Sequence, residues 1–294
     1  MTTSRPRVAI ATSTQVADLD AEGRLLLDRL EELGVGCAPE VWDDPAVPWP
    51  DYDCVVVRST WDYALRRDEY LEWADRVAGV SALLNPPELL RWTTDKHYLR
   101  ELADAGIPTV PTVFIEPGEA PDHELTGIEH VVKPAVSAGS KDTLRVGAGE
   151  GARSIGQVGA ILASGRTAIV QPYLAQVDTK GETALVFIDG AFSHAITKAA
   201  ILEAGADVVA GLFAPEQITP TTASARELDV GARSLAAVPE TDTAPLYARV
   251  DLLPGDDGVP MVLEVELAEP SLFLDHHPPS VDRLAQAILG RLDR

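Results

Sequence analysis

Positive charge is scarce in this sequence. Its 294 residues include 24 lysines and arginines against 46 aspartates and glutamates, a formal net charge of −22. Nucleic acids and anionic membranes select for clustered basic side chains, so we expect neither as a partner. We expect a small-molecule partner instead, and any phosphate that it carries must be neutralised by local cationic side chains and metal ions.

Lysine is the rarer of the two cationic residue types. The sequence has 19 arginines and only five lysines, which are Lys96, Lys133, Lys141, Lys180 and Lys198. Because the chain otherwise uses arginine for positive charge, each lysine is a better candidate than usual for a site that needs a compact ammonium group.

Cysteine and long apolar runs are also rare. Cys37 and Cys54 are the only cysteines and fall in no metal-binding or redox spacing, which favours a reduced, cytoplasmic setting. The N-terminus is polar, and the apolar run that follows it is too short for a signal peptide or a membrane span. The length predicts two or three packed units rather than one small core.

The first 90 residues alternate predicted strands and helices. Strand candidates lie at 7–11, 35–41 and 53–57, and predicted helices at 22–33 and 67–80 follow the first and the third of them. This alternation predicts an open parallel sheet that binds its ligand at the carboxyl ends of the strands.

The pattern changes near residue 90. All five tryptophans lie in the first third of the sequence, and hairpin-like segments appear after it, including a strong two-residue turn signal at Asp189-Gly190. We therefore predict a substrate-side α/β domain at 1–92, a small α+β unit at 93–174, and a C-terminal α+β unit with metal-binding strands at 175–294.

Two strand-like runs at 247–252 and 261–267 carry the strongest motif. Period-two alternation places Arg249 and Asp251 on one face of the first run, and Glu264 and Glu266 on one face of the second. If residue 251 pairs with residue 264 in an antiparallel hairpin, residue 249 falls opposite residue 266.

This register gathers three carboxylates and one arginine, a set of hard oxygen ligands that suits Mg²⁺ bridging phosphates. The apolar residues expected to pack behind it are Val250, Leu252, Leu263 and Val265. A solvated acidic face is the alternative interpretation, and the apolar character of both strands argues against it.

Two lysines stand beside possible phosphate-binding segments. A predicted strand delivers Lys133 to a loop of small residues that ends at Ser140, whose backbone N–H groups suit phosphates. Lys96 follows Thr94 and Asp95, either of which would cap a predicted helix at 98–105. For both lysines the alternative is an ordinary solvated side chain.

Two further segments are weaker candidates. A strand at 168–173 runs into a linker that could offer backbone groups to an adenine edge. Along 193–198, His194 and Lys198 share one face; His194 is more simply a core residue, whereas Lys198 is better suited to an anion.

Taken in chain order, these motifs resemble the ATP-grasp superfamily over residues 1–275. The resemblance implies an N-terminal parallel-sheet domain followed by two α+β subdomains that clasp ATP, with two Mg²⁺ ions (or Mn²⁺). The family usually closes its last acidic strand with Glu-x-Asn, whereas this sequence has Glu264-Val265-Glu266, which adds a negative charge.

The resemblance also implies roles for individual residues. Arg249, near the transferred phosphoryl group, and Lys198 would be catalytic. The implied metal ligands are Asp251, Glu264 and Glu266. The implied nucleotide contacts are Lys96, Lys133, Ser140, Gln171, Pro172, Tyr173, Leu174 and Asp178.

Within the superfamily, several segments resemble the subgroup that contains the O-ureido-serine cyclo-ligase of cycloserine biosynthesis. They are 58–63 (RSTWDY), 91–96 (RWTTDK), 132–140, Gly181-Glu182 and Ser193-His194. This implies that a substrate carboxylate is phosphorylated and that a ureido nitrogen then closes a ring.

The substrate contacts implied for such an enzyme lie at strand ends of the first domain. Arg58 suits a carboxylate and Asp62 an α-amine. Ser13, Tyr63 and His194 complete the candidates; Tyr63 is equally explained by packing between domains. Whether His194 or Glu182 touches substrate, nucleotide or neither stays open.

Two other functions remain open at this point. One is an intermolecular amino-acid or peptide ligase of the same fold, and the other is a nucleotide-binding regulatory protein without turnover. A homodimer is an expectation at the level of the family. Residues 137–140 and 205–215 are candidates for lids that exclude water.

Overall fold

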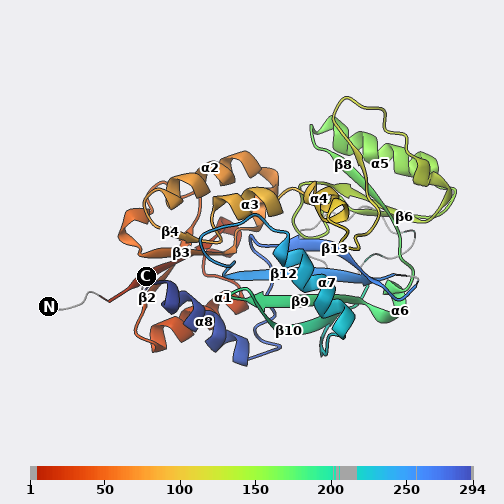
Figure 1. The fold of residues 1–294 in the computed structure, drawn as a ribbon. Helices are drawn as coiled ribbons and strands as arrows, with labels where there is room; N and C mark the ends of the chain where they lie inside the picture. The colour runs from red at the N-terminus through yellow and green to blue at the C-terminus, as the bar shows by residue number, and fades with distance from the viewer. Residues whose placement is uncertain (1–4, 201, 203–204, 206–216, 256, 293–294) are drawn as a thin grey trace.

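The computed structural model describes residues 5–200, 202, 205, 217–255 and 257–292, arranged around three sheets (Figure 1). Most of the second lid candidate, residues 206–216, lies outside the described residues. No helix of the described part is long and apolar enough to cross a membrane.

The first sheet is the predicted open parallel sheet. Its strand order is β2-β1-β3-β4, with every pairing parallel. Its strands are β1 (Arg7–Thr12), β2 (Gly36–Val41), β3 (Cys54–Ser59) and β4 (Ala82–Leu84). Short 3-10 turns follow or connect them at η1 (Thr14–Val16), η2 (Trp49–Asp51) and η3 (Trp61–Leu65).

Helices cover both faces of this sheet because its central strands alternate their buried side chains between two clusters. Val8 and Val56 face α1 (Ala21–Glu32) and the C-terminal helix α8 (Pro279–Leu292), whereas Ala9 and Val55 face the aromatic side of α2. The remaining helices of this region are α2 (Arg67–Ala78) and α3 (Pro87–Thr93). The last helix of the chain thus returns to the first sheet (Figure 1).

The second sheet has the order β5-β8-β6-β7 and is antiparallel throughout. Its strands are β5 (Val113–Ile115), β6 (His130–Pro134), β7 (Leu144–Val146) and β8 (Ala168–Pro172). Val158 and Ile161 of the amphipathic helix α5 (Gly151–Ala163) pack on Val132 and Val170. The helix α4 (Tyr98–Asp104) and the 3-10 turn η4 (Glu124–Gly127) complete this region.

The third sheet is antiparallel, with the order β11-β10-β9-β12-β13. Its strands are β9 (Glu182–Ile188), β10 (Ala191–Lys198), β11 (Ile218–Thr221), β12 (Tyr247–Pro254) and β13 (Pro260–Glu266), with helices α6 (Val177–Lys180) and α7 (Ala225–Ala236). Asp189 and Gly190 both have positive φ, 53° and 72°, so the predicted two-residue hairpin is confirmed.

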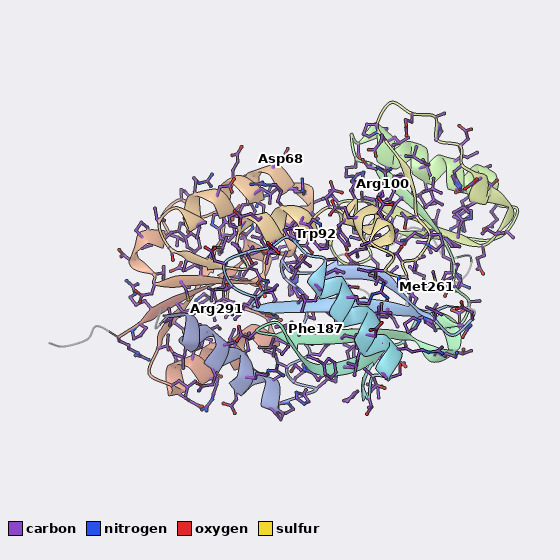
Figure 2. All side chains as sticks on the ribbon, viewed as in Figure 1. Asp68, Trp92, Arg100, Phe187, Met261 and Arg291 are labelled. Carbon is purple, nitrogen blue, oxygen red and sulfur yellow. The ribbon has the colours of Figure 1, made fainter. Side chains whose placement is uncertain are left out.

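This sheet is buried on both faces. Val186 and Ile188 join the core under the first sheet, whereas Leu185 and Phe187 face α7. Phe187 lies beside α7 (Figure 2). The helix lies so close that a β-carbon at Gly231 would sit 2.5 Å from Leu185 Cδ1. The strands that carry the acidic motif are therefore held from behind by packed apolar layers.

Candidate active site

A cavity of about 430 Å³ opens where segments of all three sheets meet. Its wall includes Tyr63 next to the first sheet, Lys133 and Gln171 of the second, and Asp251 and Glu264 of the third. Charged side chains converge on it from distant parts of the chain, which is typical of a ligand site.

The predicted pairing of the acidic strands is confirmed. Arg249 lies opposite Glu266, and Asp251 opposite Glu264, so all four side chains line the cavity. The predicted position of Leu263 is wrong. A bulge after Asp251 pairs Leu252 with Val262, so Leu263 turns into the cavity instead of packing behind the sheet.

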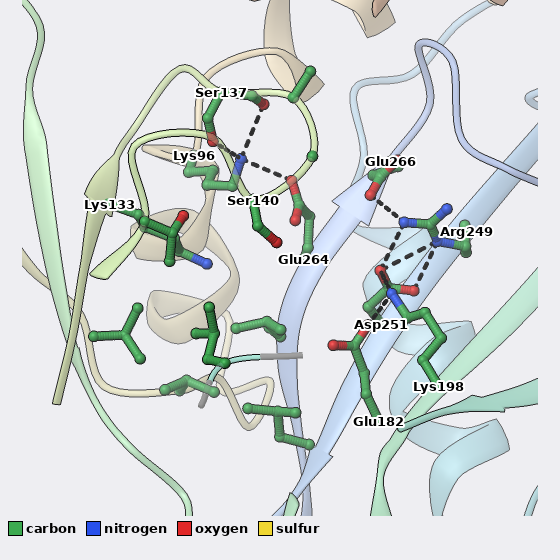
Figure 3. A pocket seen from close by; sticks show the side chains of 18 of the residues that line it. Lys96, Lys133, Ser137, Ser140, Glu182, Lys198, Arg249, Asp251, Glu264 and Glu266 are labelled. Atoms are coloured by element: carbon green, nitrogen blue, oxygen red, sulfur yellow. Dashed lines mark hydrogen bonds and ion pairs between the residues drawn. The ribbon is translucent and has the colours of Figure 1, made fainter. Parts of the chain in front are cut away.

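Arg249 and Lys198 neutralise this acidic pair of strands. Arg249 Nε donates to Asp251 Oδ1 at 2.9 Å, and Arg249 Nη2 pairs with Glu266. Lys198 Nζ lies 2.9 Å from Asp251 Oδ2 and also contacts Glu182 (Figure 3). The network joins β9, β10, β12 and β13 through charges that burial makes costly to separate.

The carboxyl groups of this network outnumber Arg249 and Lys198, so their negative charge is only partly neutralised. Burial opposes ionisation of Asp251, but Arg249 and Lys198 outweigh it and hold the pKa of Asp251 below its usual range. Burial raises the pKa of Glu182 to about 7 despite Lys198, and that of Glu266 to about 8 despite Arg249. A surplus of buried carboxyl oxygens fits a divalent cation.

The metal ligands themselves stay a prediction. Among the described residues, no three His, Cys, Asp or Glu side chains already form a cluster that could hold an ion. The reason is visible in the pairing: Asp251, Glu264 and Glu266 each contact a cationic side chain of the protein.

Lys96 is held at the rim of the acidic strands. Its Nζ lies 2.7 Å from Glu264 Oε1 and 3.2 Å from Ser137 Oγ, and its backbone N donates to the carbonyl of Ala135. Lys96 thus joins the acidic strand to the loop of small residues after β6, as Figure 3 shows.

The helix-cap interpretation of the residues before Lys96 is wrong. Thr94 Oγ1 donates back to the carbonyl of Leu90 at 2.7 Å, and Asp95 Oδ1 contacts the backbone N and the ring of His97. The helix α4 begins after His97 without a side-chain cap.

Lys133 projects from β6 into the cavity without an ion-pair partner among the described residues. Enclosure by the protein lowers its pKa to about 8, although Glu264 opposes the shift. An ammonium group left unpaired beside a small-residue loop is suited to an anionic ligand such as phosphate.

Most of the predicted nucleotide strip lines the same cavity: Ser140, Gln171, Pro172, Tyr173 and Leu174. Gln171 Nε2 donates to Thr112 Oγ1, and the guanidinium of Arg145 stacks 3.5 Å from the ring of Tyr173. Asp178 lies outside the cavity wall, where it accepts from Arg145 at 3.2 Å and from the hydroxyl of Tyr173.

Of the substrate candidates in the first domain, only Tyr63 lines the cavity. Asp62 is held by Trp42 Nε1 at 2.9 Å and by Arg66 at 2.8 Å. Arg58 is buried against Glu22, 3.2 Å away.

Two other substrate candidates are buried away from the cavity. The hydroxyl of Ser13 is buried without a hydrogen-bond partner in the described structure. His194 stacks on His277 at 4.5 Å, and its Nε2 donates to the carbonyl of Leu272. Burial lowers the pKa of His194 to about 4, so the ring is neutral. Direct substrate contact by Ser13, Arg58, Asp62 and His194 stays a prediction.

Sequence reasoning missed one charged side chain of the cavity, Glu269. It follows the last acidic strand, in a segment without strand or helix periodicity. The available signal was a lone glutamate among apolar residues and next to Pro270, directly after the acidic motif.

The architecture matches solved ATP-grasp ligases. D-alanine–D-alanine ligase from Bacillus anthracis, complexed with ATP, superposes with a TM-score of 0.71 at 16% identity, covering 98% of this chain and 97% of that one. The ATP-grasp ligase PsnB complexed with minimal precursor gives a TM-score of 0.62 at 17% identity, covering 96% and 99%. These likenesses show that the chain has the ATP-grasp fold.

Closer relatives narrow the class. Residues 8–85 match the family described as D-cycloserine synthetase DcsG, N-terminal domain. The cycloserine biosynthesis protein DcsG of Streptomyces lavendulae is 36% identical over 97% of this chain and 98% of its own length. The crystal structure of D-cycloserine synthetase DcsG superposes with a TM-score of 0.89 at 35% identity, covering 97% and 99%. The chain belongs to the DcsG family.

Proposed function

We propose that this protein is a Mg-ATP-dependent cyclo-ligase that converts O-ureido-D-serine into D-cycloserine. One observation carries the proposal: the register of β12 and β13 places Arg249, Asp251, Glu264 and Glu266 on the wall that also holds Lys96 and Lys133. The similarity to DcsG over nearly the whole chain supports the choice of substrate.

The proposed reaction has two chemical stages. The substrate carboxylate attacks the γ-phosphorus of ATP, which releases ADP and forms an acyl phosphate. The ureido nitrogen bonded to oxygen then attacks the acyl carbon, inorganic phosphate leaves, and hydrolysis of the carbamoyl group completes the ring product. Such phosphoryl transfer depends on positioning and charge stabilisation rather than on covalent participation of the protein.

The phosphate end of the cavity is built from Lys96, Lys133 and the loop at 137–140. The two ammonium groups would hold the phosphates, and the loop would exclude the water that hydrolyses an acyl phosphate. Arg249 would contact the group in transfer. Residues 171–174 would face the adenine edge.

The carboxylates of Asp251, Glu264 and Glu266 would hold Mg²⁺, two ions in our proposal. The fit rests on five acidic side chains facing four cationic ones on the described wall. When bound, the metal would supply further positive charge to the phosphates. Both cysteines, Cys37 and Cys54, are free thiols, which supports a reducing cytoplasmic setting.

The first experiment measures ADP release from Mg-ATP by the purified protein with O-ureido-D-serine, its L enantiomer, and single or paired amino acids. We expect O-ureido-D-serine alone to stimulate release and to yield the ring product. Stimulation only by a pair of amino acids would establish an intermolecular ligase. Nucleotide binding without release under any condition would establish a regulatory protein.

Because Lys133 has no ion-pair partner in the part of the chain that the structure describes, we expect nucleotide binding to take up a proton. With a pKa of about 8, the ammonium is partly deprotonated at pH 8.5, and nearby phosphate raises its pKa and restores the charge. Calorimetric titration with Mg-ATP, without amino-acid substrate, in two buffers of different ionisation enthalpy measures this uptake at pH 8.5.

The control for this measurement is Lys133→Arg. Arginine stays charged at pH 8.5, so the part of the proton uptake that comes from residue 133 should vanish. Titration of the acidic groups contributes to both proteins and cancels in the difference. Equal uptake by both proteins would show that Lys133 does not meet the phosphates.

A further inference from the structure

The cavity wall contains two charged side chains of opposite sign that lack an ion-pair partner among the described residues, Lys133 and Glu269. The other charged residues of the described wall are paired: Lys96 with Glu264, Lys198 with Glu182 and Asp251, and Arg249 with Asp251 and Glu266. Lys133 suits the phosphates. Glu269 is therefore the acid of the described wall that can accept a cationic group of a ligand without first breaking an ion pair.

Glu269 is one of the most enclosed acids of the molecule, with 6% of its surface exposed. Arg249 and Lys96 are the cationic side chains that lower the pKa of Glu269, and both already bind other carboxylates. Burial raises the pKa of Glu269 to about 7 even with these neighbours present. An ionised carboxylate in this position is costly until a ligand cation neutralises it.

Hydrogen bonds hold the backbone on both sides of Glu269. On one side, the hydroxyl of Tyr247 donates to the carbonyl of Ala268 at 2.8 Å. On the other side, Arg249 Nη1 donates to the carbonyl of Ser271 at 3.1 Å. These contacts set where the backbone presents Glu269 to the cavity.

Glu22 anchors the next part of this loop. Its carboxylate accepts from the backbone N of Leu272 and from that of Phe273, both at 2.8 Å. Glu22 itself is buried beside Arg58, so a buried charged pair under the first sheet supports the loop. Such supporting contacts are what a precise binding group needs.

We propose that Glu269 binds the α-ammonium group of the amino-acid substrate. This inference rests on the proposed function, in which Arg249 contacts the phosphoryl group in transfer to the substrate carboxylate. An α-amino acid carries its ammonium group two bonds from the carboxyl carbon, and Glu269 faces the same cavity as Arg249, Trp61 and Tyr63. A charge-assisted hydrogen bond in this enclosed position would select α-amino acids over carboxylates that lack an amino group.

The assignment replaces Asp62 as the partner of the amine. Asp62 had been expected from its place after β3, but Arg66 and Trp42 occupy its oxygens away from the cavity. Glu269 lines the cavity and has no ion-pair partner among the described residues, whereas Asp62 does neither.

The test combines a change in the enzyme with a change in the substrate. The enzymes are the wild type and Glu269→Gln, and the substrates are O-ureido-D-serine and the same compound without its amino group. We expect the wild type to lose about 100-fold or more in kcat/KM for ADP release when the amino group is removed. In Glu269→Gln this loss should shrink to a few-fold, because the amine no longer meets a carboxylate.

Further variants separate recognition from folding. Glu269→Asp keeps the charge on a shorter side chain and should recover part of the discrimination. Glu240→Gln changes an exposed glutamate in the same way and should behave as the wild type. A circular dichroism spectrum shows whether each variant is folded.

Three outcomes are distinguishable. Equal discrimination by wild type and Glu269→Gln would overturn the proposal. Unchanged discrimination together with an increased Mg²⁺ requirement would also overturn it and make Glu269 a metal ligand. Absence of ADP release by the wild type with either compound would instead contradict the proposed function.

Discussion

Glu264→Gln should reduce substrate-stimulated ADP release by about 1,000-fold or more, because it removes one of the carboxylates proposed to hold Mg²⁺ at the phosphate end of the cavity. Glu264 faces Asp251 across the strand pair and lies 2.7 Å from Lys96 Nζ. The neutral amide has nearly the same shape, so the lost quantity is negative charge. The measurement is the rate of ADP release at saturating O-ureido-D-serine and Mg-ATP.

Two comparisons make the result on Glu264 specific. Glu240→Gln, an exposed change of the same kind, should retain the wild-type rate. If the loss comes from weakened metal binding, raising the Mg²⁺ concentration should restore part of the activity of Glu264→Gln. Near-normal activity of Glu264→Gln at low Mg²⁺ would refute both the metal assignment and the proposed catalytic role of this wall.

Arg249→Met should abolish measurable turnover and lower the free energy of unfolding by about 3–5 kcal/mol. The reason is that Arg249 pairs with both Asp251 and Glu266 on the buried strands, so its removal leaves two carboxylates with less neutralisation. Burial already favours the protonated form of Glu266, whose pKa is raised to about 8. Urea denaturation followed by circular dichroism measures the stability.

Arg249→Lys is the matched comparison for this prediction. It keeps the positive charge, but a lysine cannot reproduce the planar fork that reaches Asp251, Glu266 and the carbonyl of Ser271 together. We expect it to recover part of the stability but little of the turnover. Stability of Arg249→Met within 0.5 kcal/mol of the wild type, well below the loss expected for a broken buried pair, would show that the network does not hold the strands.

The acidic strand pair shows what alternation along a strand can and cannot predict. Alternation along 247–252 and 261–267 was enough to predict that Arg249 faces Glu266 and that Asp251 faces Glu264. The prediction failed at Leu263, because this residue is the extra one of a bulge in β13, between Val262 and Glu264, and it lines the cavity. Alternation does not reveal a bulge.

The resemblance of the ordered motifs to ATP-grasp proteins was confirmed by the solved relatives, and most of the nucleotide strip does line one cavity. The first domain was less predictable. Arg58 lies near the carboxyl end of β3 and Asp62 lies just beyond it, yet Glu22 and Arg66 neutralise them away from the cavity. Position after a strand does not say which opposite charge a side chain will meet.

What the sequence by itself determined was local: the strands and helices, the face on which each acidic residue lies, and the family to which the order of motifs points. Backbone geometry transmits this information over a few residues, since side chains repeat every two positions in a strand. Only the tertiary structure decided which charges are paired. It brought α8 back to the first sheet, joined Glu22 to the backbone of Leu272 and left Glu269 on the cavity wall without an ion-pair partner among the described residues. These contacts link residues far apart in the chain.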